Sequence, residues 1–474
     1  MAEYIENAEK QRQKEYLYRL QELNNDFYMR RGRKPLANTE TYGCQQNEND
    51  TERIRGILKE AGFGFCDNAN DADLVIYNTC AVRENAEDRV YGRLGILKHI
   101  KESRPELKIG LCGCMVQQEH IVEKIKKIHN HVDLIFGTHA LYKLPQLLYE
   151  VYTEDKTVID AENSDGAICE DLPIMRESDS KAWVSIMYGC NNFCSYCIVP
   201  YVRGRERSRR PEKIIDEIRG LTGGGVTEIC LLGQNVNSYG KDLADGIDFS
   251  DLLRMVNALD GVKRIRFMTS HPKDFSDRLI GAMAECDKVC PQLHLPFQAG
   301  SDRILAQMNR KYTKAEYLDK IRRVKERIPN LALSTDVIVG FPTETNEDFA
   351  ETLDVLRKVE FDTIFSFIYS RREGTPAAKL DFVLTDAEIH KNFNELLDVQ
   401  NEISRRKNDA YVGRTCTVLV DGVSKNNPEM LSGRTDTSKI VNFRGGAELA
   451  GKYVDVKITE AHTWSLNGEL IKGE

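Results

Sequence analysis

Short apolar runs alternate with longer stretches of helical length between residues 36 and 151. The apolar runs lie at 39–43, 72–77, 107–111 and 132–136. Helical stretches follow them at 48–61, at 85–103, up to residue 128, and from residue 141 onward. Strands that alternate with helices in this way predict a parallel sheet.

A second alternation of the same kind occupies the middle of the chain. Its apolar runs lie at 182–187, 228–232, 264–268, 292–295, 331–338 and 363–368. Six strand–helix units predict a partial (βα)6 barrel, because a closed eight-stranded barrel needs two more units before the composition changes near Gly413. A long helical stretch at 386–410 leads to short strands at 415–420, 439–443 and 453–458, which predict a small β-barrel.

These patterns predict an α/β protein of five segments. They are a polar, solvated extension at 1–34, a parallel-sheet domain at 35–151, an acidic, irregular linker at 152–176, the partial barrel at 177–410, and the small carboxyl-terminal β-barrel at 411–474. At 474 residues the chain is too long for one compact core, which agrees with several domains.

Composition limits the class of protein. No apolar run has the length of a membrane span, and residues 1–6 lack the apolar core of a signal peptide, so we expect a cytoplasmic protein that does not enter a membrane. Thirteen cysteines in such a protein indicate metal or redox chemistry rather than disulfides. The net charge of −8 argues against nucleic-acid binding by bulk charge but leaves room for a local basic surface.

Three cysteines, Cys190, Cys194 and Cys197, stand at spacing C-x-x-x-C-x-x-C directly after a predicted strand. Thiolates are soft ligands that suit zinc or iron–sulfur clusters. A closed structural zinc site needs a fourth protein ligand, and none stands nearby. The spacing therefore favours a 4Fe-4S cluster with one open iron; an ordinary loop or part of a zinc site is the alternative.

Three further cysteine positions follow strands of the first predicted sheet. They are Cys44, Cys80 and the pair Cys112 and Cys114. Because the carboxyl ends of parallel strands meet at one edge of the sheet, these thiols are expected to lie close together. Topology alone allows a second cluster or three buried structural cysteines.

The spacing of Cys190, Cys194 and Cys197, with Tyr196 just before the third, resembles the signature of the radical S-adenosylmethionine (SAM) enzymes. This resemblance implies that the open iron binds the amino and carboxylate groups of SAM. It also implies that the reduced cluster cleaves SAM to a 5′-deoxyadenosyl radical. Tyr196 is therefore an expected cofactor contact.

Polar residues follow several predicted barrel strands, where the chemistry of barrels is found. Candidates for contact with SAM or substrate are Gln234, Ser270 and Gln298. Capping of the next helix is the alternative for each. His271 is a candidate general base. The stretch 337–341 resembles the adenine-contacting strand of the superfamily, which implies an apolar and backbone contact at Ile338.

The residues around the earlier cysteines carry a second resemblance. They read Thr-Tyr-Gly-Cys44-Gln-Gln-Asn, Asn-Thr-Cys80 and Gly-Cys114-Met-Val-Gln-Gln. They are similar to the three cysteine motifs of the methylthiotransferase amino-terminal domain. The third ligand of that family is the cysteine of Gly-Cys-x-x-Gln, which selects Cys114 and leaves Cys112 as the spare. The resemblance implies a second 4Fe-4S cluster.

The tail resembles the TRAM domain, an OB-like RNA-binding module, so the three parts resemble the methylthiotransferase family in this order. The stretches 231–240 and 267–272 are close to the branch that modifies N6-isopentenyladenosine in tRNA. This resemblance implies transfer of a methylthio group to C2 of that nucleoside next to the anticodon. SAM would serve as methyl donor and as radical source, and an external donor such as flavodoxin or ferredoxin would supply electrons.

Local basic residues are the expected contacts with the tRNA anticodon loop. They are Arg203, Arg205 and Arg207 after the cysteine loop, and Arg434 and Lys439 in the tail. Related branches act on threonylcarbamoyladenosine in tRNA or on an aspartate of a ribosomal protein. A two-cluster electron carrier and a noncatalytic RNA-binding protein are the alternatives from other classes.

Overall fold

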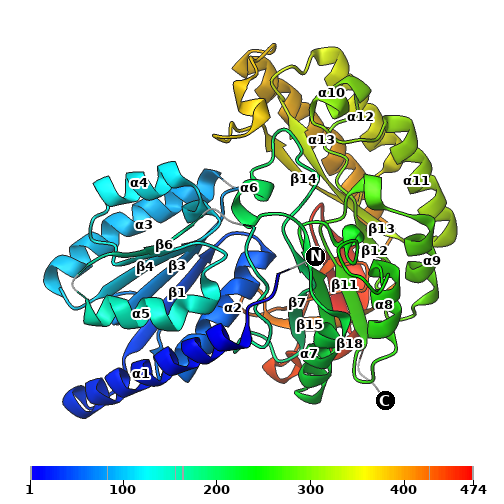
Figure 1. The fold of residues 1–474 in the computed structure, drawn as a ribbon. Helices are drawn as coiled ribbons and strands as arrows, with labels where there is room; N and C mark the ends of the chain where they lie inside the picture. The colour runs from blue at the N-terminus through cyan, green and yellow to red at the C-terminus, as the bar shows by residue number, and fades with distance from the viewer. Residues whose placement is uncertain (1–2, 83, 155, 163–164, 426, 472–474) are drawn as a thin grey trace.

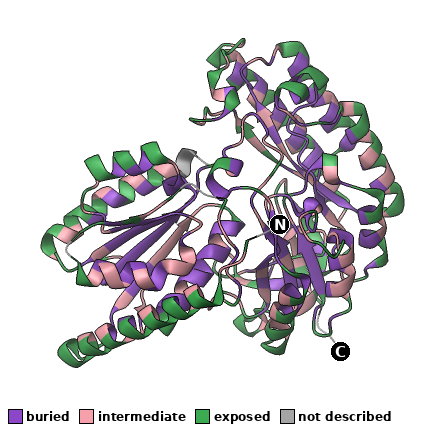
Figure 2. Cartoon of the chain, in the orientation of Figure 1, coloured by how far each residue is buried: buried purple, intermediate pink, exposed green. Residues whose placement is uncertain are grey.

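The computed structural model describes residues 3–82, 84–154, 156–162, 165–425 and 427–471 (Figure 1). Among them, one six-stranded sheet, two three-stranded sheets, one closed five-stranded barrel and one two-stranded sheet are formed. Figure 2 shows the strands of the first domain as a buried layer between helices with exposed outer faces. The expected α/β class is confirmed, with a parallel-sheet domain, a partial barrel of six parallel strands and a small closed β-barrel.

The first sheet is parallel throughout and contains two strands more than the four expected. Its order is β2 (Gly64–Phe65), β1 (Leu36–Tyr42), β3 (Leu74–Thr79), β4 (Lys108–Gly113), β5 (Leu134–Phe136) and β6 (Val158–Asp160). β2 is too short for its alternation to be read in the sequence. β6 lies within the stretch that we expected to be an irregular linker, and its pairing with β5 makes it part of the sheet.

Helices cover both faces of this sheet. They are α1 (Asn7–Arg31), α2 (Gln45–Glu60), α3 (Glu84–Ser103), α4 (Glu119–Ile128) and α5 (Leu144–Thr153). Ile54 of α2 and Leu148 of α5 belong to the core on one face, whereas Leu94 of α3 and Ile125 of α4 belong to the core on the other. The two cores hold the carboxyl ends of the strands, and hence the cysteines that follow them, in fixed positions.

The amino-terminal extension packs against this domain instead of being solvated as we expected. Helix α1 lies along α5 (Figure 1), and its Leu20 is fully buried in the core. The Asn24 side-chain amide donates a hydrogen bond of 2.8 Å to the carbonyl oxygen of Ala61. The sequence conceals this contact because most of the helix is polar and the buried positions form only a narrow stripe.

Leu20→Ala tests whether α1 is an integral part of the domain. We expect a loss of about 2–5 kcal/mol in the free energy of unfolding, because the substitution leaves a cavity in a packed core. The measurement is urea unfolding of the amino-terminal domain within the full chain. Tyr18→Ala, at a side chain that is 62% exposed, is the matched control and should change stability by less than about 0.5 kcal/mol. Equal values for the two variants would contradict the packing of α1.

The middle of the chain forms six parallel strands in sequence order, as predicted. They are β7 (Lys181–Ser185), β10 (Glu228–Leu232), β11 (Arg264–Phe267), β12 (Gln292–His294), β13 (Ala332–Val339) and β14 (Thr363–Ile368). Two three-stranded sheets, β7-β10-β11 and β12-β13-β14, are linked by a bridge between Ile265 and Val289. The first and last strands, β7 and β14, are not paired with each other, so the barrel is open.

Helices surround the outside of this open barrel (Figure 1). They are α7 (Pro211–Gly223), α8 (Phe249–Asn257), α9 (Asp277–Glu285), α10 (Asp302–Gln307), α11 (Lys314–Arg327), α12 (Asn346–Val359) and α13 (Asp386–Asp409). Short elements also follow β7, namely β8 (Met187–Tyr188), α6 (Val199–Arg203) and β9 (Arg207–Ser208). These short elements carry and enclose the cysteine loop.

The carboxyl-terminal barrel closes in the order β15-β16-β17-β19-β18. Its strands are β15 (Thr415–Val423), β16 (Leu431–Arg434), β17 (Ile440–Phe443), β18 (Tyr453–Ala461) and β19 (Leu466–Leu470). The Arg264 and Arg266 guanidiniums donate hydrogen bonds of 2.7 Å to the carbonyl oxygens of Thr417 and Thr435, respectively. Arg264 begins β11, so the small barrel docks at the amino ends of the strands, opposite the cysteine loop.

Candidate active site

The first cysteine triad lies in a loop held shut by a short hairpin. β8 pairs with β9, and the Cys190 amide donates to the carbonyl oxygen of Gly204 at 3.1 Å. Gly189 has a φ of 76°, and a Cβ there would lie 2.0 Å from the carbonyl oxygen of Arg205. Only glycine fits this close approach. The loop therefore presents three thiols at the carboxyl end of β7.

Cys190, Cys194 and Cys197 adjoin one another within this loop. Burial raises the pKa of Cys190 to about 12, and the neighbouring Cys194 adds to the shift. Burial and then Cys194 also raise the pKa of Cys197. The buried Arg310 guanidinium donates to the Cys194 sulfur at 3.5 Å and to the Tyr196 hydroxyl at 3.5 Å. One fixed cation therefore lies beside a triad that must become negative to bind metal.

The second triad is assembled from three strand ends, as expected. Cys44 caps the start of α2, Cys80 follows β3, and Cys114 follows β4. A hydrogen bond from the Cys80 thiol lowers the pKa of Cys44, and this interaction and burial raise the pKa of Cys80, with a further contribution from nearby Cys114. Residues separated by up to 70 positions in the sequence therefore interact as one group.

Cys112 and Cys114 have different surroundings although only one residue separates them. Cys112 belongs to the apolar core that includes Leu134 and Phe136. Cys114 instead lies in a small buried cluster with Ala81, Ile198 and Val202 at the contact between the two large domains. The choice of Cys114 as the third ligand agrees with this placement, and Cys112 has the surroundings of a structural cysteine.

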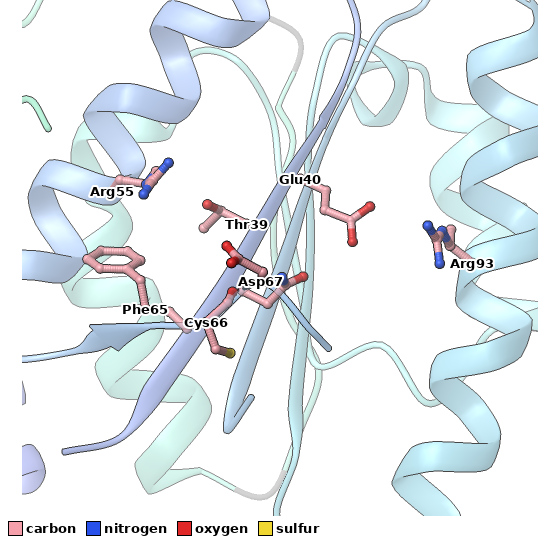
Figure 3. A pocket seen from close by; sticks show the side chains of 9 residues that line it. Thr39, Glu40, Arg55, Phe65, Cys66, Asp67 and Arg93 are labelled. Carbon is pink, nitrogen blue, oxygen red and sulfur yellow. Dashed lines mark hydrogen bonds between the residues drawn. The ribbon is translucent and has the colours of Figure 1, made fainter. Parts of the chain in front are cut away.

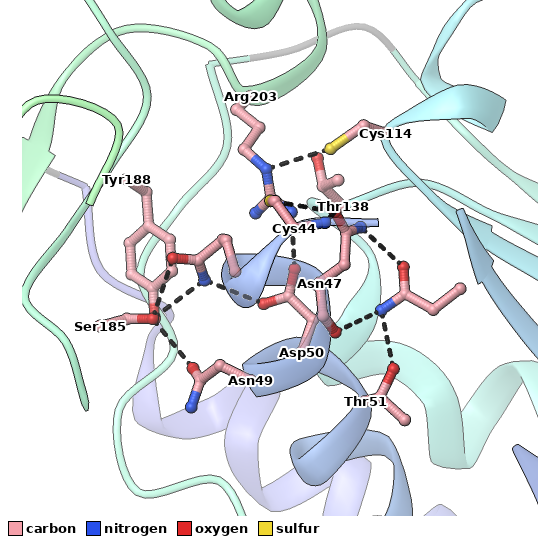
Figure 4. A network of polar contacts seen from close by, with 12 residues as sticks. Cys44, Asn47, Asn49, Asp50, Thr51, Cys114, Thr138, Ser185, Tyr188 and Arg203 are labelled. Carbon is pink, nitrogen blue, oxygen red and sulfur yellow. Dashed lines mark hydrogen bonds and ion pairs between the residues drawn. The ribbon is translucent and has the colours of Figure 1, made fainter. Parts of the chain in front are cut away.

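Helix α6 joins the two triads. It begins two residues after Cys197, and its last residue, Arg203, donates a hydrogen bond of 3.1 Å from Nε to the Cys114 sulfur. The same guanidinium donates to the Asp50 carboxylate at 2.8 Å (Figure 4). Since a helix rises about 1.5 Å per residue, the five residues of α6 span roughly 8 Å, and this short helix and the Arg203 side chain connect the two triads.

Polar side chains of α2 fix the two domains against each other around this helix. Gln46 and Asn49 bond to the Ser185 hydroxyl at the end of β7, at 2.9 Å each (Figure 4). Arg53 donates to the Tyr188 hydroxyl at 2.7 Å. Buried polar groups need partners, so these contacts specify one docking geometry rather than a loose one.

The residues expected to contact RNA divide into buried and exposed groups. Arg203, Arg207 and Lys439 are buried, with exposed fractions of 5%, 7% and 7%. Lys439 pairs with the Asp362 carboxylate at 2.9 Å, and the Arg207 guanidinium donates to backbone carbonyls of its own hairpin. These three side chains therefore lie in the interior and not on the surface where we placed them. Charge spacing in a sequence does not reveal such partners.

Arg205 and Arg434 are the members of that set that reach the surface. Arg205 is exposed and lies over the Phe193 ring at 5.2 Å. Arg434 is exposed on the small barrel, where it donates to the carbonyl oxygen of Ser438 at 3.2 Å. They stay predicted RNA contacts.

Three expected cofactor residues gather around the mouth of the barrel. Gln234 accepts a hydrogen bond of 2.5 Å from the Gly189 amide and so orients the cysteine loop. Gln298 has a φ of 68°, and its carbonyl oxygen accepts from the Ile338 amide at 2.9 Å. This hydrogen bond brings Ile338 beside the segment that follows β12, as expected for an apolar wall of a cofactor site.

Buried polar atoms that find no hydrogen-bond partner among the described residues mark the same end of the barrel. They are Ser270 Oγ, His271 Nε2 and Asn235 Oδ1. His271 Nδ1 accepts from the Lys273 amide at 3.1 Å, and burial lowers the pKa of the ring, which keeps it neutral. Orphaned buried groups of this kind suit a polar ligand. A role for His271 as a base stays a prediction.

Both triads fit iron–sulfur clusters by the chemistry of their donors. Each offers three thiols, and thiolates are the usual ligands of such clusters. Among the described residues, no three His, Cys, Asp or Glu side chains converge on one point as they would around a single ion. A cuboidal cluster takes each thiolate on a different iron and so needs them farther apart. The orphaned atoms near Ser270 fit SAM.

Glu344 is a buried acid at this mouth that the sequence did not single out. One oxygen of its carboxylate accepts from the Gly340 amide at 2.6 Å, and the other has no hydrogen-bond partner in the described part of the chain. Burial raises the pKa to about 8 from an ordinary 4.5. The unfolded chain therefore releases this proton at lower pH than the folded protein. Stability from this group is present below pH 4.5 and is lost as the pH rises to 8.

Glu344→Gln is expected to remove that pH dependence. The difference of 3.5 units corresponds to at most about 5 kcal/mol, so the variant should unfold at higher urea than the parent at pH 8.5 and at the same urea at pH 5. The measurement is the difference in unfolding midpoint between parent and variant at each pH. Glu347→Gln, at a solvent-exposed carboxylate, should show no such difference. If the unfolding midpoints of the parent and of Glu344→Gln changed with pH in the same way, the raised pKa of Glu344 would be contradicted.

A cavity of about 310 Å³ lies away from the two cysteine triads, at the amino half of β1, and Cys66 is among the residues that line it (Figure 3). Arg55 and Arg93 approach it from the helices on either side of the sheet, and Glu40 and Asp67 also line it. Its charges are mixed, and β1 runs from it toward Cys44 at the opposite end. It therefore does not belong to the candidate active site.

The open barrel and its cysteine loop define a radical SAM enzyme, and residues 184–356 match the Radical SAM superfamily. The chain is also 54% identical over 469 residues to a tRNA-2-methylthio-N(6)-dimethylallyladenosine synthase from Acetivibrio thermocellus, across 99% of this chain and 98% of that protein. A synthase of the same name from Clostridioides difficile is 53% identical over 462 residues, across 97% of each. This protein belongs to the family of tRNA-2-methylthio-N(6)-dimethylallyladenosine synthases.

The flanking parts match families as well. Residues 37–137 match the uncharacterized protein family UPF0004, and residues 409–471 match the TRAM domain. A solved radical S-adenosylmethionine methyltransferase from Kitasatospora setae shares the fold, with a TM-score of 0.53 and 13% identity across 72% of this chain and 74% of that one. The family resemblance seen in the motifs is confirmed, and with it the expected cofactors, SAM and two 4Fe-4S clusters. No described helix is long and apolar enough to cross a membrane.

Proposed function

We propose that this protein adds a methylthio group to C2 of N6-dimethylallyladenosine, also called isopentenyladenosine, next to the anticodon of tRNA. One observation carries this proposal beyond family membership: two thiol triads lie at the two ends of the same short helix. The C2–H bond of adenine is not acidic, so proton transfer by a side chain cannot open it. The reaction needs both a radical source and a sulfur source near one base, which two triads at the ends of α6 provide.

Cys190, Cys194 and Cys197 are proposed to hold one cluster, and Cys44, Cys80 and Cys114 the other. When bound, these clusters together with SAM supply the radical, the methyl group and the sulfur. The chain itself contributes placement. The buried cations beside the triads, Arg310 at the first and Arg203 at the second, offset the negative charge of the thiolates.

The mouth of the barrel is proposed to bind SAM through its orphaned polar atoms. Ser270 Oγ and Asn235 Oδ1 have no hydrogen-bond partner among the described residues. Neutral His271 accepts at Nδ1, so its Nε2–H is free to donate to a carboxylate or hydroxyl oxygen of the ligand. Ile338 supplies an apolar wall beside the Gln298 carbonyl. These groups orient a ligand and exclude water, and none of them needs to move a proton during hydrogen abstraction.

Partners follow from the same proposal. The TRAM-like barrel and the exposed Arg205 and Arg434 are proposed to contact the tRNA, whose anticodon loop can present an unpaired base. Electrons are proposed to come from a small redox protein such as flavodoxin or ferredoxin, in the cytoplasm. Both triads can be approached from the surface, because Cys44 of the second triad is exposed and Cys190 and Cys197 of the first are half-buried.

The test is anaerobic incubation of the reconstituted protein with reductant, SAM and prenylated tRNA, followed by nucleoside analysis. The 2-methylthio derivative of dimethylallyladenosine together with 5′-deoxyadenosine is the expected result. A product on threonylcarbamoyladenosine, or on an aspartate of a ribosomal protein, would move the protein to another methylthiotransferase activity. Absence of 5′-deoxyadenosine would overturn the radical mechanism.

A further inference from the structure

Two phenylalanines of β14 are exposed although they face the inside of the barrel. Phe365 is 45% exposed and Phe367 is 46% exposed. Ile364, between Thr363 and Phe365, is instead buried in the core under the outer helices. Side chains alternate along a strand, so Phe365 and Phe367 share the opposite, inner face. Two large apolar side chains exposed side by side inside a barrel indicate an occupant.

The surroundings of this pair are apolar toward the mouth and polar below it. Phe367 is in register with Ile338 of β13, and Phe365 is in register with Asp336. The Phe365 ring also meets the ring of His294 edge-on, at 5.7 Å between centroids. His294 in turn pairs with Asp336 at 3.5 Å. The pair therefore forms an exposed apolar surface with the Asp336 carboxylate at its lower end.

The segment after β14 ties this surface to both cysteine triads. The Arg372 guanidinium donates to the carbonyl oxygen of Val82, two residues after Cys80, at 2.8 Å. The Ala377 amide donates to the carbonyl oxygen of Ser195, directly after Cys194, at 2.9 Å. β14 is also an unpaired edge of the open barrel, on the side of α6 (Figure 1). The segment that follows the aromatic pair thus contacts residues next to both triads.

We propose that Phe365 and Phe367 form the platform that holds the prenylated adenine of the tRNA during methylthiolation. This inference rests on the proposed function and names the residues that select its substrate. Unstacked RNA bases commonly lie on aromatic side chains. The five-carbon prenyl group adds an apolar surface that the second ring and Ile338 bury. A platform on this edge strand presents the base to the triads while the ribose and phosphates remain outside the barrel.

The same surface explains how related nucleosides are rejected. An unmodified adenosine has no apolar group to bury against the second ring. A threonylcarbamoyl group carries a carboxylate, which would lose its hydration against two phenylalanine rings and lie near the Asp336 carboxylate. The platform therefore favours the prenylated base both by apolar contact and by exclusion of negative charge.

The experiment measures binding of the cluster-loaded protein to anticodon stem-loops that differ only in the base next to the anticodon. Fluorescence anisotropy gives the ratio of Kd for the unmodified stem-loop to Kd for the prenylated one. We expect the parent to prefer the prenylated stem-loop by about tenfold or more. Phe365→Ala and Phe367→Ala together should bring this ratio close to one. Tyr28→Ala, at an exposed aromatic on α1, is the matched control and should keep the ratio of the parent.

Phe365→Leu and Phe367→Leu keep apolar volume and guard against misfolding. These variants should retain part of the preference for the prenyl group but bind every stem-loop about 5- to 100-fold more weakly, because base stacking is lost. Unchanged binding and an unchanged ratio in all variants would overturn the platform. Loss of SAM cleavage in the absence of RNA would assign the rings to SAM and overturn it as well. A parent that does not methylthiolate prenylated tRNA would instead overturn the proposed function.

Discussion

Cys114→Ala is expected to remove half of the iron and sulfide from the anaerobically reconstituted protein and to abolish methylthiolation. The physical reason is that the remaining thiols, Cys44 and Cys80, leave two irons of a cluster without protein ligands. Cleavage of SAM in the presence of reductant should continue, because Cys190, Cys194 and Cys197 are untouched. The measurements are iron and sulfide counting, and quantification of 5′-deoxyadenosine and of the modified nucleoside.

Two companion variants make this result specific. Cys112→Ala is the matched control, because Cys112 is buried in the apolar core two positions before Cys114, and this variant should keep full iron content. Cys190→Ala should also lose half of the iron but should abolish SAM cleavage. Full loss of iron in either single variant, or retention of all iron in Cys114→Ala, would show that the two triads do not hold separate clusters.

The grouping of the cysteines could be predicted from the sequence because it follows from the positions of the strands and from local spacing. Cys44, Cys80 and Cys114 each follow a strand of a parallel sheet, so their proximity follows once the strands are recognised. Cys190, Cys194 and Cys197 are local in sequence and need no long-range argument. The six barrel strands could be predicted for a similar reason, since buried parallel strands form continuous apolar runs.

Other features depend on partners that a linear pattern does not contain. The basic stretch from Arg203 to Arg207 has the composition of an RNA-binding surface, yet Arg203 lies between a thiol and a carboxylate supplied by the other domain. Helix α1 is mostly polar, yet Leu20 occupies a core built from α2 and α5. Phe365 and Phe367 lie in an apolar run that is typical of a buried strand, yet both are exposed at the open edge of the barrel.

These features converge on the contact between the two large domains. α2 contributes polar side chains to the end of β7, and α6 contributes Arg203 to the second triad. The loop after β14 adds a third link between the two domains, the hydrogen bond from Arg372 to the carbonyl oxygen of Val82. Rigid docking matters here because a radical and a sulfur source must reach the same carbon, and a shift of about 1 Å in position is costly in such reactions.

Arg203→Met is expected to destabilise this contact strongly. The substitution leaves the Asp50 carboxylate buried without its cation and removes the donor to Cys114, and loss of one partner of a buried ion pair costs about 3–5 kcal/mol. Urea unfolding of the full chain measures the loss, and limited proteolysis between the domains reports undocking. Arg205→Ala, at an exposed neighbour, should change stability by less than about 0.5 kcal/mol.

A double variant separates the ion pair from simple packing. Arg203→Met combined with Asp50→Leu replaces both charges by apolar groups, and such replacements are often neutral. The double variant should therefore recover most of the stability lost in Arg203→Met, while methylthiolation stays low because Cys114 still lacks its donor. Additive losses would contradict a direct pair between Arg203 and Asp50. If Arg203→Met weakened tRNA binding and left stability unchanged, Arg203 would instead be an RNA contact, as the neighbouring arginines in the sequence suggest.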